Sequence, residues 1–229
     1  MWLRFLALGL GAMALATLLA SGPGTRLGLW DWRAGLGLLR YATYLGIGAS
    51  VVAVVALAIP PIRRGHARML ILALVLGLAS LAPPLAFQRH ARAVPPINDI
   101  TTETGNASKA QRDAYPDIQP ITLAEPPLKA FERAVAAAQA MGWEIVARDP
   151  AAGRIEAVDI TFWFGFKDDV VVRVAAAPGG GSRVEVRSKS RVGRGDTGTN
   201  ARRIRGFRER LSYLGYPRGI ADSWKGKST

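Results

Sequence analysis

Residues 36–59 read LGLLRYATYLGIGASVVAVVALAI, an apolar run with a single charge at Arg40. Similar runs lie on either side of it, from Trp2 to Ala20 and from Met69 to Phe87. A helix rises about 1.5 Å per residue, so each run is long enough to cross a hydrocarbon core of about 30 Å. The long side chain of Arg40 can reach the interface from near the start of its helix.

These runs predict two domains: a bundle of three transmembrane helices in residues 1–93 and a soluble domain in residues 94–229. A cleaved signal peptide is the alternative for Met1 to Ser21, because a basic residue precedes an apolar run and small residues follow it. The length of that run and the two later spans favour a retained helix. Small residues at four-residue spacing would let the helices approach closely, although small residues are abundant here in any case. They are Ala12, Ala16, Ala20, Gly46, Ser50, Ala73 and Gly77.

The net charge of +13 is concentrated in the apolar part of the chain. Residues 1–95 hold nine arginines and one acid, whereas the soluble domain is only mildly basic. The absence of cysteine excludes thiolate nucleophiles, disulfides and thiolate metal sites. His66 and His90 lie in basic stretches beside the spans and are predicted to be interfacial. We therefore expect no cofactor and no metal.

The short loops predict the orientation in the membrane. The loop Pro60 to Arg68 holds three arginines and no acid, whereas the two arginines of Ser21 to Gly35 are offset by Asp31. The positive-inside rule then places the Pro60 to Arg68 loop in the cytoplasm and the soluble domain outside it. Arg89 and Arg92 after the last span favour the reverse orientation.

The soluble part begins with a polar segment, Val94 to Thr122, which we expect to be a tether followed by extended surface chain. A helix is predicted from Pro126 to Gly142, with an apolar stripe at Leu128, Phe131, Val135, Ala138 and Met141. Four strands joined by short turns follow, and short turns make neighbouring strands antiparallel. They are Trp143 to Arg148, Arg154 to Phe166, Asp169 to Ala176 and Arg183 to Val192.

A last helix is indicated by Thr199 as cap, by Gly215 and Pro217 as terminators, and by one apolar face. That face carries Ile204, Phe207, Leu211 and Leu214. The predicted fold class is α+β: three transmembrane helices, then an antiparallel four-stranded sheet with two helices packed on one face.

The strand Arg183 to Val192 alternates between apolar or small residues and charged residues. Its charged face and the arginines of the last helix could pair with phosphate, lipid head groups or an acidic polymer. A solvated sheet face explains the same pattern. The candidate ligand-binding residues are Arg187, Lys189, Arg191, Arg194, Asp196, Asn200, Arg203 and Trp163.

Two further clusters have both structural and functional interpretations. The glycine-rich segment from Ser188 to Asn200 could form an anion site before a helix, but it lacks a Walker spacing, and we favour a structural loop. The acids Glu156, Asp159, Asp168 and Asp169 lack an orienting histidine, so we expect turn and ion-pair roles rather than catalysis. The aromatic run Phe162, Trp163, Phe164 and Phe166 is expected to pack in a core, unless an exposed Trp163 contacts a ligand or the bilayer interface.

The soluble part resembles the bacterial and plastid domain of unknown function 1499. The resemblance covers about Pro95 to Leu214. It rests on Asn98 to Thr102, Tyr115-Pro116, Gly142-Trp143, Arg154 to Ala157, Thr161, Phe164 to Phe166, Asp168 to Val170, Val186 to Gly193, Asp196, Gly198, Asn200-Ala201 and Arg203-Ile204. It implies an envelope location, in the bacterial inner (plasma) membrane, because proteins of this kind often carry membrane spans or lipid anchors before the domain. It implies no catalytic residues.

We expect a non-enzymatic envelope module that binds or scaffolds at the membrane. Its partners would be the lipid bilayer and an anionic lipid head group, an envelope polymer or a membrane protein. The alternative is a metal-assisted hydrolase or transferase that uses Asp159, Asp196 and a neighbouring serine. Nucleic-acid binding ranks third, since basic surfaces attract phosphate backbones but the predicted compartment holds none. A cytoplasmic scaffold would follow from the reverse orientation.

Overall fold

The computed structural model describes residues 2–214, and the chain forms two compact units. The first unit comprises the chain up to Arg92 together with the short segment Phe162–Gly165, and the second comprises the remainder. Gly215 and Pro217, which were expected to end the last helix, lie outside the described residues.

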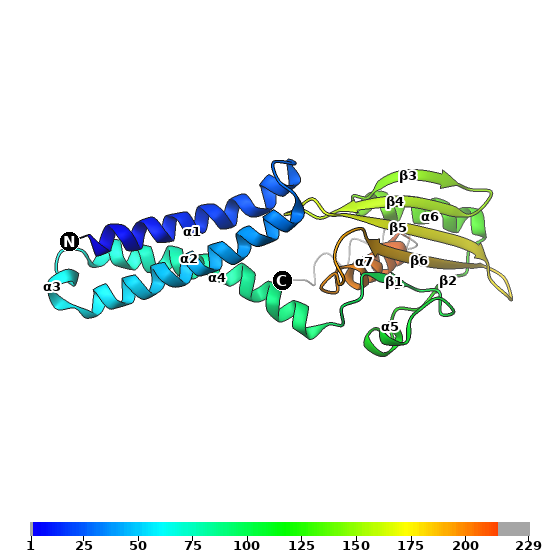
Figure 1. Ribbon diagram of the computed structural model, residues 1–229. Coiled ribbons are helices and arrows are strands. Elements are labelled where there is room, and N and C mark those ends of the chain that lie inside the picture. The colour runs from blue at the N-terminus through cyan, green and yellow to red at the C-terminus, as the bar shows by residue number, and fades with distance from the viewer. Residues whose placement is uncertain (1, 215–229) are drawn as a thin grey trace. The chain divides into compact units, whose positions relative to one another are not determined.

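Long helices make up the first unit (Figure 1). They are α1 (Leu3–Arg26), α2 (Trp32–Ala58) and α4 (Ala67–Ala93), with the single turn α3 (Pro60–Arg63) between α2 and α4. An 18-residue stretch of each long helix has a mean hydropathy of 1.9 in α1, 1.8 in α2 and 2.3 in α4, and each helix is long and apolar enough to cross a membrane. The predicted helices are confirmed, and each extends by several residues beyond its predicted apolar run at one end or both.

Helices α2 and α4 approach closely at a pair of glycines. A Cβ atom placed on Gly46 would lie 2.8 Å from the carbonyl oxygen of Gly77, and one on Gly77 would lie 2.8 Å from the carbonyl oxygen of Gly46. The prediction of small residues in the interface therefore holds for these two helices.

The same prediction is wrong for α1. Its buried face carries Ala7, Gly11, Ala14 and Leu18, whereas Ala12, Ala16 and Ala20 are exposed. In a helix where almost every residue is apolar, spacing alone does not select the face that packs.

Up to Leu214, the second unit contains a sheet and three helices. Its strands are β1 (Asp99–Thr101), β2 (Ile121–Leu123), β3 (Glu144–Asp149), β4 (Arg154–Ile160), β5 (Lys167–Ala176) and β6 (Ser182–Ser190). Its helices are α5 (Lys109–Ala114), α6 (Pro127–Ala140) and α7 (Thr199–Tyr213).

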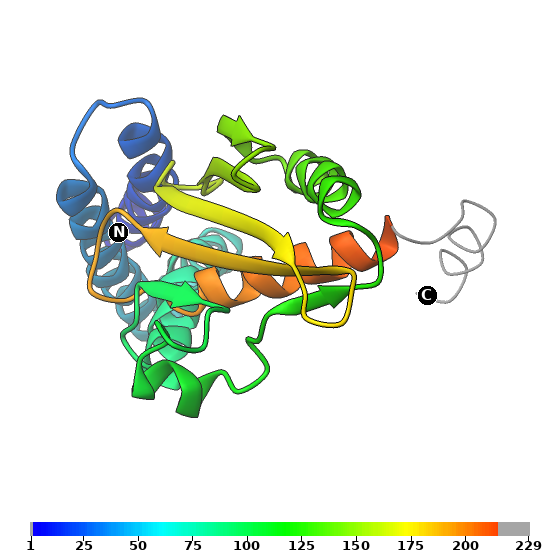
Figure 2. The ribbon, with the colours of Figure 1, turned by 90° about the vertical axis from the view of Figure 1, so that its right-hand side faces the viewer.

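The sheet is antiparallel and has six strands, not the predicted four. Its order is β1-β6-β5-β4-β3, and β2 also pairs with β6. Figure 2 shows β5 and β6 side by side, joined by a tight hairpin. The segment predicted as tether and surface chain supplies the missing strands: Ile100 pairs with Ser188, and Ile121 pairs with Val184.

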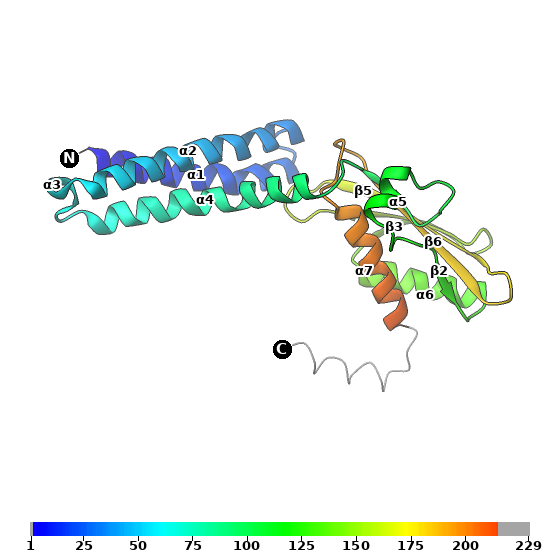
Figure 3. The ribbon, with the colours of Figure 1, turned by 90° about the horizontal axis from the view of Figure 1, so that it is seen from below.

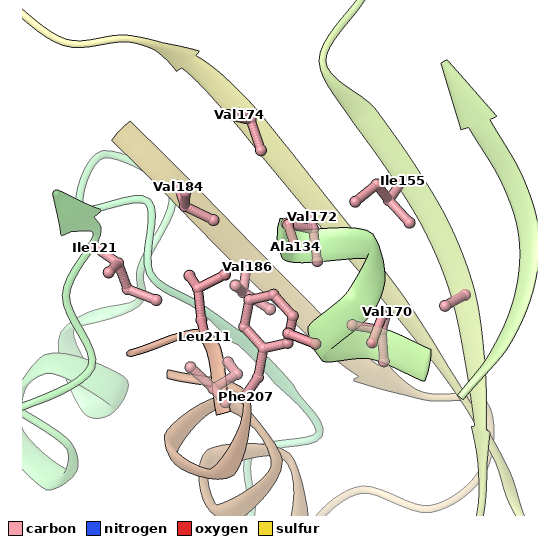
Figure 4. Close-up of a cluster of buried hydrophobic side chains, with 14 of the residues drawn as sticks. Ile121, Ala134, Ile155, Val170, Val172, Val174, Val184, Val186, Phe207 and Leu211 are labelled. Atoms are coloured by element: carbon pink, nitrogen blue, oxygen red, sulfur yellow. The ribbon is translucent and has the colours of Figure 1, made fainter. Parts of the chain in front are cut away.

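Both α6 and α7 cover the same face of the sheet (Figure 3). The inward residues of β4, β5 and β6 meet the apolar faces of these helices in one core, drawn in Figure 4. The rings of Trp143 and Phe207 stack there with centroids 5.2 Å apart. On α6 the predicted stripe is shifted, because Leu128 is 61% exposed while Ala130, Ala134 and Ala137 are buried. The predicted α+β class, with two helices on one face, is confirmed.

Candidate functional site: the open face of the sheet

The face of the sheet opposite α6 and α7 carries charged side chains. On β6 the predicted alternation is confirmed: Val184, Val186, Ser188 and Ser190 are buried, while the residues between them are partly or fully exposed. These intervening residues are Arg183, Glu185, Arg187 and Lys189, and Arg191 continues the series. The register places outward residues of β4 and β5 beside them.

A groove of about 610 Å³ lies on this face. Its sheet side is formed by Arg154 of β4, by Val171 and Arg173 of β5, and by residues of β6. Its other side is formed by β1 and by the segment that leads into α5. The charged lining residues are Asp99, Glu103, Arg154, Arg173, Glu185 and Arg187. The groove therefore offers three guanidinium groups and three carboxylates to a ligand.

One of these arginines is firmly paired. Nε and Nη2 of Arg187 donate to the two carboxylate oxygens of Asp99, at 2.9 and 2.5 Å. These hydrogen bonds raise the pKa of Arg187 above its ordinary value. A similar pair joins Arg191 to Asp169, with Nη2 and Oδ1 2.6 Å apart. Both arginines have exposed side chains, but both already have a bidentate partner.

Arg154 and Arg173 are less well compensated. They lie directly opposite each other on β4 and β5, an arrangement of like charges that destabilises a sheet. Nε of Arg154 donates to Glu156 at 2.7 Å, whereas the nearest approach of Arg173 to Glu103 is 3.8 Å. Arg173 is also the more exposed, at 56% of its side chain. This pair is the part of the groove best suited to receive an anionic group.

Neither Arg154 nor Arg173 is among the ligand-binding residues predicted from the sequence. Each is an outward residue in an alternating strand, so the pattern alone marks them as exposed. Their juxtaposition depends on the register of β4 and β5, which residue spacing within one strand does not show.

Among the predicted ligand-binding residues, Lys189 and Arg194 are exposed. Asp196 instead binds the start of α7, because its carboxylate accepts hydrogen bonds from the backbone amides of Gly198 and Asn200 at 2.9 and 2.5 Å. The helix therefore has Gly198 as its N-cap residue, not the predicted Thr199.

The side chains of Arg203 and Asn200 are buried between α7 and the sheet. Arg203 has 2% of its side chain exposed, and its guanidinium donates to Asp159 and Asp168, each at 2.6 Å. Nη1 of Arg203 also donates to Ser188 at 2.8 Å. In the described structure, Arg203 is therefore enclosed and satisfied by its own chain.

Asn200 extends this network toward the edge of the sheet. Its amide nitrogen donates to Oγ of Ser190 at 3.0 Å and to the carbonyl oxygen of Asn98 at 3.1 Å. Its amide oxygen accepts from Ser188 at 2.7 Å. The network thus ties α7, β6 and the residue before β1 to one another.

Two carboxylates in this network share one guanidinium. Burial raises the pKa of Asp168 above its ordinary value, while the charge and hydrogen bond of Arg203 act in the opposite direction. Asp159 faces Asp168 across β4 and β5 and adds to the increase in the Asp168 pKa. Burial in the network therefore disfavours the charged form of Asp168.

The structure gives the remaining candidate, Trp163, a place in the first unit. Trp163 contacts Gly22 of α1 and is partly buried. Strand β4 ends at Ile160, so the predicted strand from Arg154 to Phe166 was too long, and the aromatic run forms the turn before β5.

The carboxylates considered for catalysis have structural partners: Asp159 binds Arg203, and Asp196 binds helix amides. Within residues 2–214, no three His, Cys, Asp or Glu side chains converge in a way that could hold a metal ion.

The second unit is thus a small α+β domain with one covered and one open face of its sheet, and it follows three apolar helices. The family model described as "Protein of unknown function (DUF1499)" matches residues 97–211. This match spans half of the chain, and the protein belongs to the DUF1499 family. No curated protein and no solved structure matches the chain.

Proposed function

We propose that the protein is a membrane-anchored binding or scaffolding module of the bacterial envelope, without enzymatic activity, that receives an anionic ligand or partner on the open face of its sheet. Three helices of sufficient length and hydropathy support the membrane location. Arg63 and Arg64 between α2 and α4, with Arg68 in the first turn of α4, support a cytoplasmic position for that connection. With three crossings, we propose that the second unit lies outside the cytoplasm.

The groove on the open face is the observation that carries the binding role. Protein ligand sites commonly have volumes of about 300–1,000 Å³, and this groove of about 610 Å³ lies within that range. Guanidinium groups bind carboxylate and phosphate through two parallel hydrogen bonds. An incoming anion at Arg154 and Arg173 would also relieve the repulsion between these two cations.

The acids around the groove add selectivity to this proposal. Asp99, Glu103 and Glu185 repel a ligand that carries only negative charge at every position. We therefore expect a ligand with a single anionic group, which binds at Arg154 and Arg173. The rest of the ligand would be neutral or cationic and would lie along β1.

The alternative, a metal-assisted hydrolase or transferase, depends on Asp159 and Asp196. Their carboxylates are engaged by Arg203 and by the amides at the start of α7. A catalytic role would require these contacts to break, which would leave Arg203 without one of its partners in a buried site. The contacts therefore favour the binding module.

Charge removal at the groove should weaken anion binding. In the full-length protein, held in nanodiscs of zwitterionic lipid, the double variant Arg154→Gln/Arg173→Gln should bind inorganic phosphate, a single small anion, at least about tenfold more weakly than the wild type. The reason is that two charge-assisted contacts of about 1.5–3 kcal/mol each are lost. Isothermal titration calorimetry at low ionic strength measures the difference.

A matched control separates this site from general charge. Arg148 and Arg210 are exposed on β3 and α7, away from the groove, and the variant Arg148→Gln/Arg210→Gln carries the same net charge. It should bind inorganic phosphate almost as tightly as the wild type. Equal affinity of the wild type and the groove variant would rule out this face as the anion site.

A further inference from the structure

The segment Phe162–Gly165 fits closely against α1. Gly22 lies under the indole of Trp163, and a Cβ atom at Gly22 would come within 2.2 Å of Cδ1 of Trp163. Backbone and ring can approach this closely only because Gly22 lacks a side chain. Trp163 therefore packs directly against the backbone of α1 within the first unit.

Polar and steric contacts fix the ends of the segment. Nη1 of Arg26 donates to the carbonyl oxygen of Phe162 at 2.5 Å. Gly165 has a φ of +68°, and a Cβ atom there would lie 2.9 Å from Cγ of Arg26. The last residue of α1 thus holds both ends of the aromatic segment.

A pocket of about 330 Å³ lies beside Trp163. Its lining residues are all apolar: Leu18, Leu19, Leu39, Pro83, Phe87, Trp163 and Phe164. Ligand pockets for polar molecules include a few placed hydrogen-bonding groups, and this lining provides almost none. The chemistry fits a flexible hydrocarbon chain and does not fit a sugar, nucleotide or amino acid.

The pocket lies at a definite depth along the helices. Leu19 is seven residues before the end of α1, and Leu39 is seven residues after the start of α2. At about 1.5 Å per residue, both lie about 10 Å from the helix ends, within the hydrocarbon region of a bilayer. Leu19 and Phe87 are about half exposed, so the pocket opens toward the surroundings of the helices.

Positive charge lies nearer to the helix ends. Arg89 and Arg92 follow Phe87 on the last turns of α4, and Arg26 ends α1. Basic residues at this level attract the phosphate of a lipid head group. A phospholipid could therefore place its phosphate near these arginines and one acyl chain between the helices.

We propose that this pocket binds one acyl chain of a membrane phospholipid, with Trp163 and Phe164 as one wall. The inference rests on the membrane location proposed above. It gives the aromatic segment a role separate from ligand binding on the sheet: the segment closes a lipid site in the first unit.

A photoactivatable lipid tests the proposal. The full-length protein is reconstituted in vesicles of phosphatidylcholine and phosphatidylglycerol that contain a trace of phosphatidylglycerol with a diazirine on its acyl chain. After illumination, trypsin releases Ile155–Lys167, a single peptide that contains the aromatic segment. We expect lipid adducts on this peptide as well as on peptides of α1, α2 and α4.

Two variants that fill the pocket sharpen the test. Leu39→Trp and Leu19→Trp should each lower labelling of Ile155–Lys167 at least about threefold. Leu72→Trp, at a half-exposed position of α4 outside the pocket, should leave labelling unchanged. Near-UV circular dichroism identifies a variant that has misfolded. The other filling variant then shows whether filling the pocket lowers the labelling.

Each other outcome overturns the proposal in a distinct way. Labelled helices with an unlabelled Ile155–Lys167 peptide would contradict the lipid site and leave the membrane location standing. Labelling that neither filling variant reduces would show that lipid reaches only the exposed Phe162. Absence of adducts on every peptide of the three helices would contradict the membrane location as well.

Discussion

Replacing Arg203 with leucine is expected to lower the free energy of unfolding of the second unit by about 3–5 kcal/mol. The side chain of Arg203 is 2% exposed and donates to Asp159 and Asp168 at 2.6 Å. Its removal leaves the carboxylate of Asp168, which is 4% exposed, buried with one negative charge uncompensated. Hydrogen exchange of the β5 and β6 backbone amides in the detergent-solubilised protein measures the loss.

The loss should depend on pH in a defined direction. Burial already raises the pKa of Asp168 in the folded protein, and the variant loses the guanidinium that lowers it. The folded state therefore binds a proton more readily than the unfolded chain, whose aspartate has a pKa of about 3.9. Stability falls as the pH rises from that value through the raised folded pKa, so the deficit should be smaller at pH 5 than at pH 8.

Asp168→Asn provides a matched comparison for Arg203→Leu. An asparagine keeps an oxygen that accepts from Arg203 and removes the buried negative charge, so it should cost clearly less. A loss of unfolding free energy below about 1 kcal/mol in Arg203→Leu, or a loss that does not change with pH, would contradict this prediction. It would show that Arg203 does not stabilise the folded protein by compensating the charge of Asp168.

The second large effect is expected at Phe207. Phe207 is fully buried, and its ring stacks on Trp143 with an interplanar angle of 13°. Phe207→Ala should destabilise the second unit by about 3–5 kcal/mol, because a buried ring is replaced by a cavity. Hydrogen exchange of the β5 and β6 backbone amides measures this change.

Two variants calibrate the Phe207 result. Phe207→Leu keeps most of the volume and should cost less than the alanine. Leu128→Ala on α6, where the residue is 61% exposed, should change stability by only about 0.5 kcal/mol. Similar losses for Phe207→Ala and Leu128→Ala would mean that the stacked pair does not hold the core together.

The elements with a strong residue period were predictable from the sequence. Strand β6 alternates at every position from Arg183 to Ser190, and the structure buries the alternate residues as expected. Helix α7 repeats apolar residues at helical spacing, and Ile204, Phe207 and Leu211 are fully buried. In both elements one face packs against the core and the other is partly or fully exposed. The residue period therefore predicts both the type of element and its buried face.

Short strands and buried polar groups were not predictable in this way. Strands β1 and β2 have three residues each, too few to show a period, and they form because β6 offers them a partner. Arg203 and Asn200 looked like surface residues because polar side chains usually are exposed. Only the three-dimensional arrangement brings Ser188, Asp159 and Asp168 to them.

These buried groups also change how the family resemblance is understood. Ser188, Ser190, Asp196, Asn200 and Arg203 are among the residues that carry it, and in the structure all five belong to the network or the cap at the start of α7. In this chain, then, part of the pattern that carries the resemblance forms the junction of helix and sheet. We expect the proposed binding function of this protein at the groove arginines Arg154 and Arg173.

A cysteine-labelling measurement tests the central claim, that three helices cross the membrane and hold the sheet outside the cytoplasm. The chain has no cysteine, so Lys109→Cys at the start of α5 and Arg64→Cys between α3 and α4 each give a single label site. With a membrane-impermeant maleimide on intact spheroplasts, Lys109→Cys should react, and Arg64→Cys should react only after lysis. Equal reaction of both sites before lysis would contradict a membrane between them, and the reverse pattern would contradict the placement of the sheet outside.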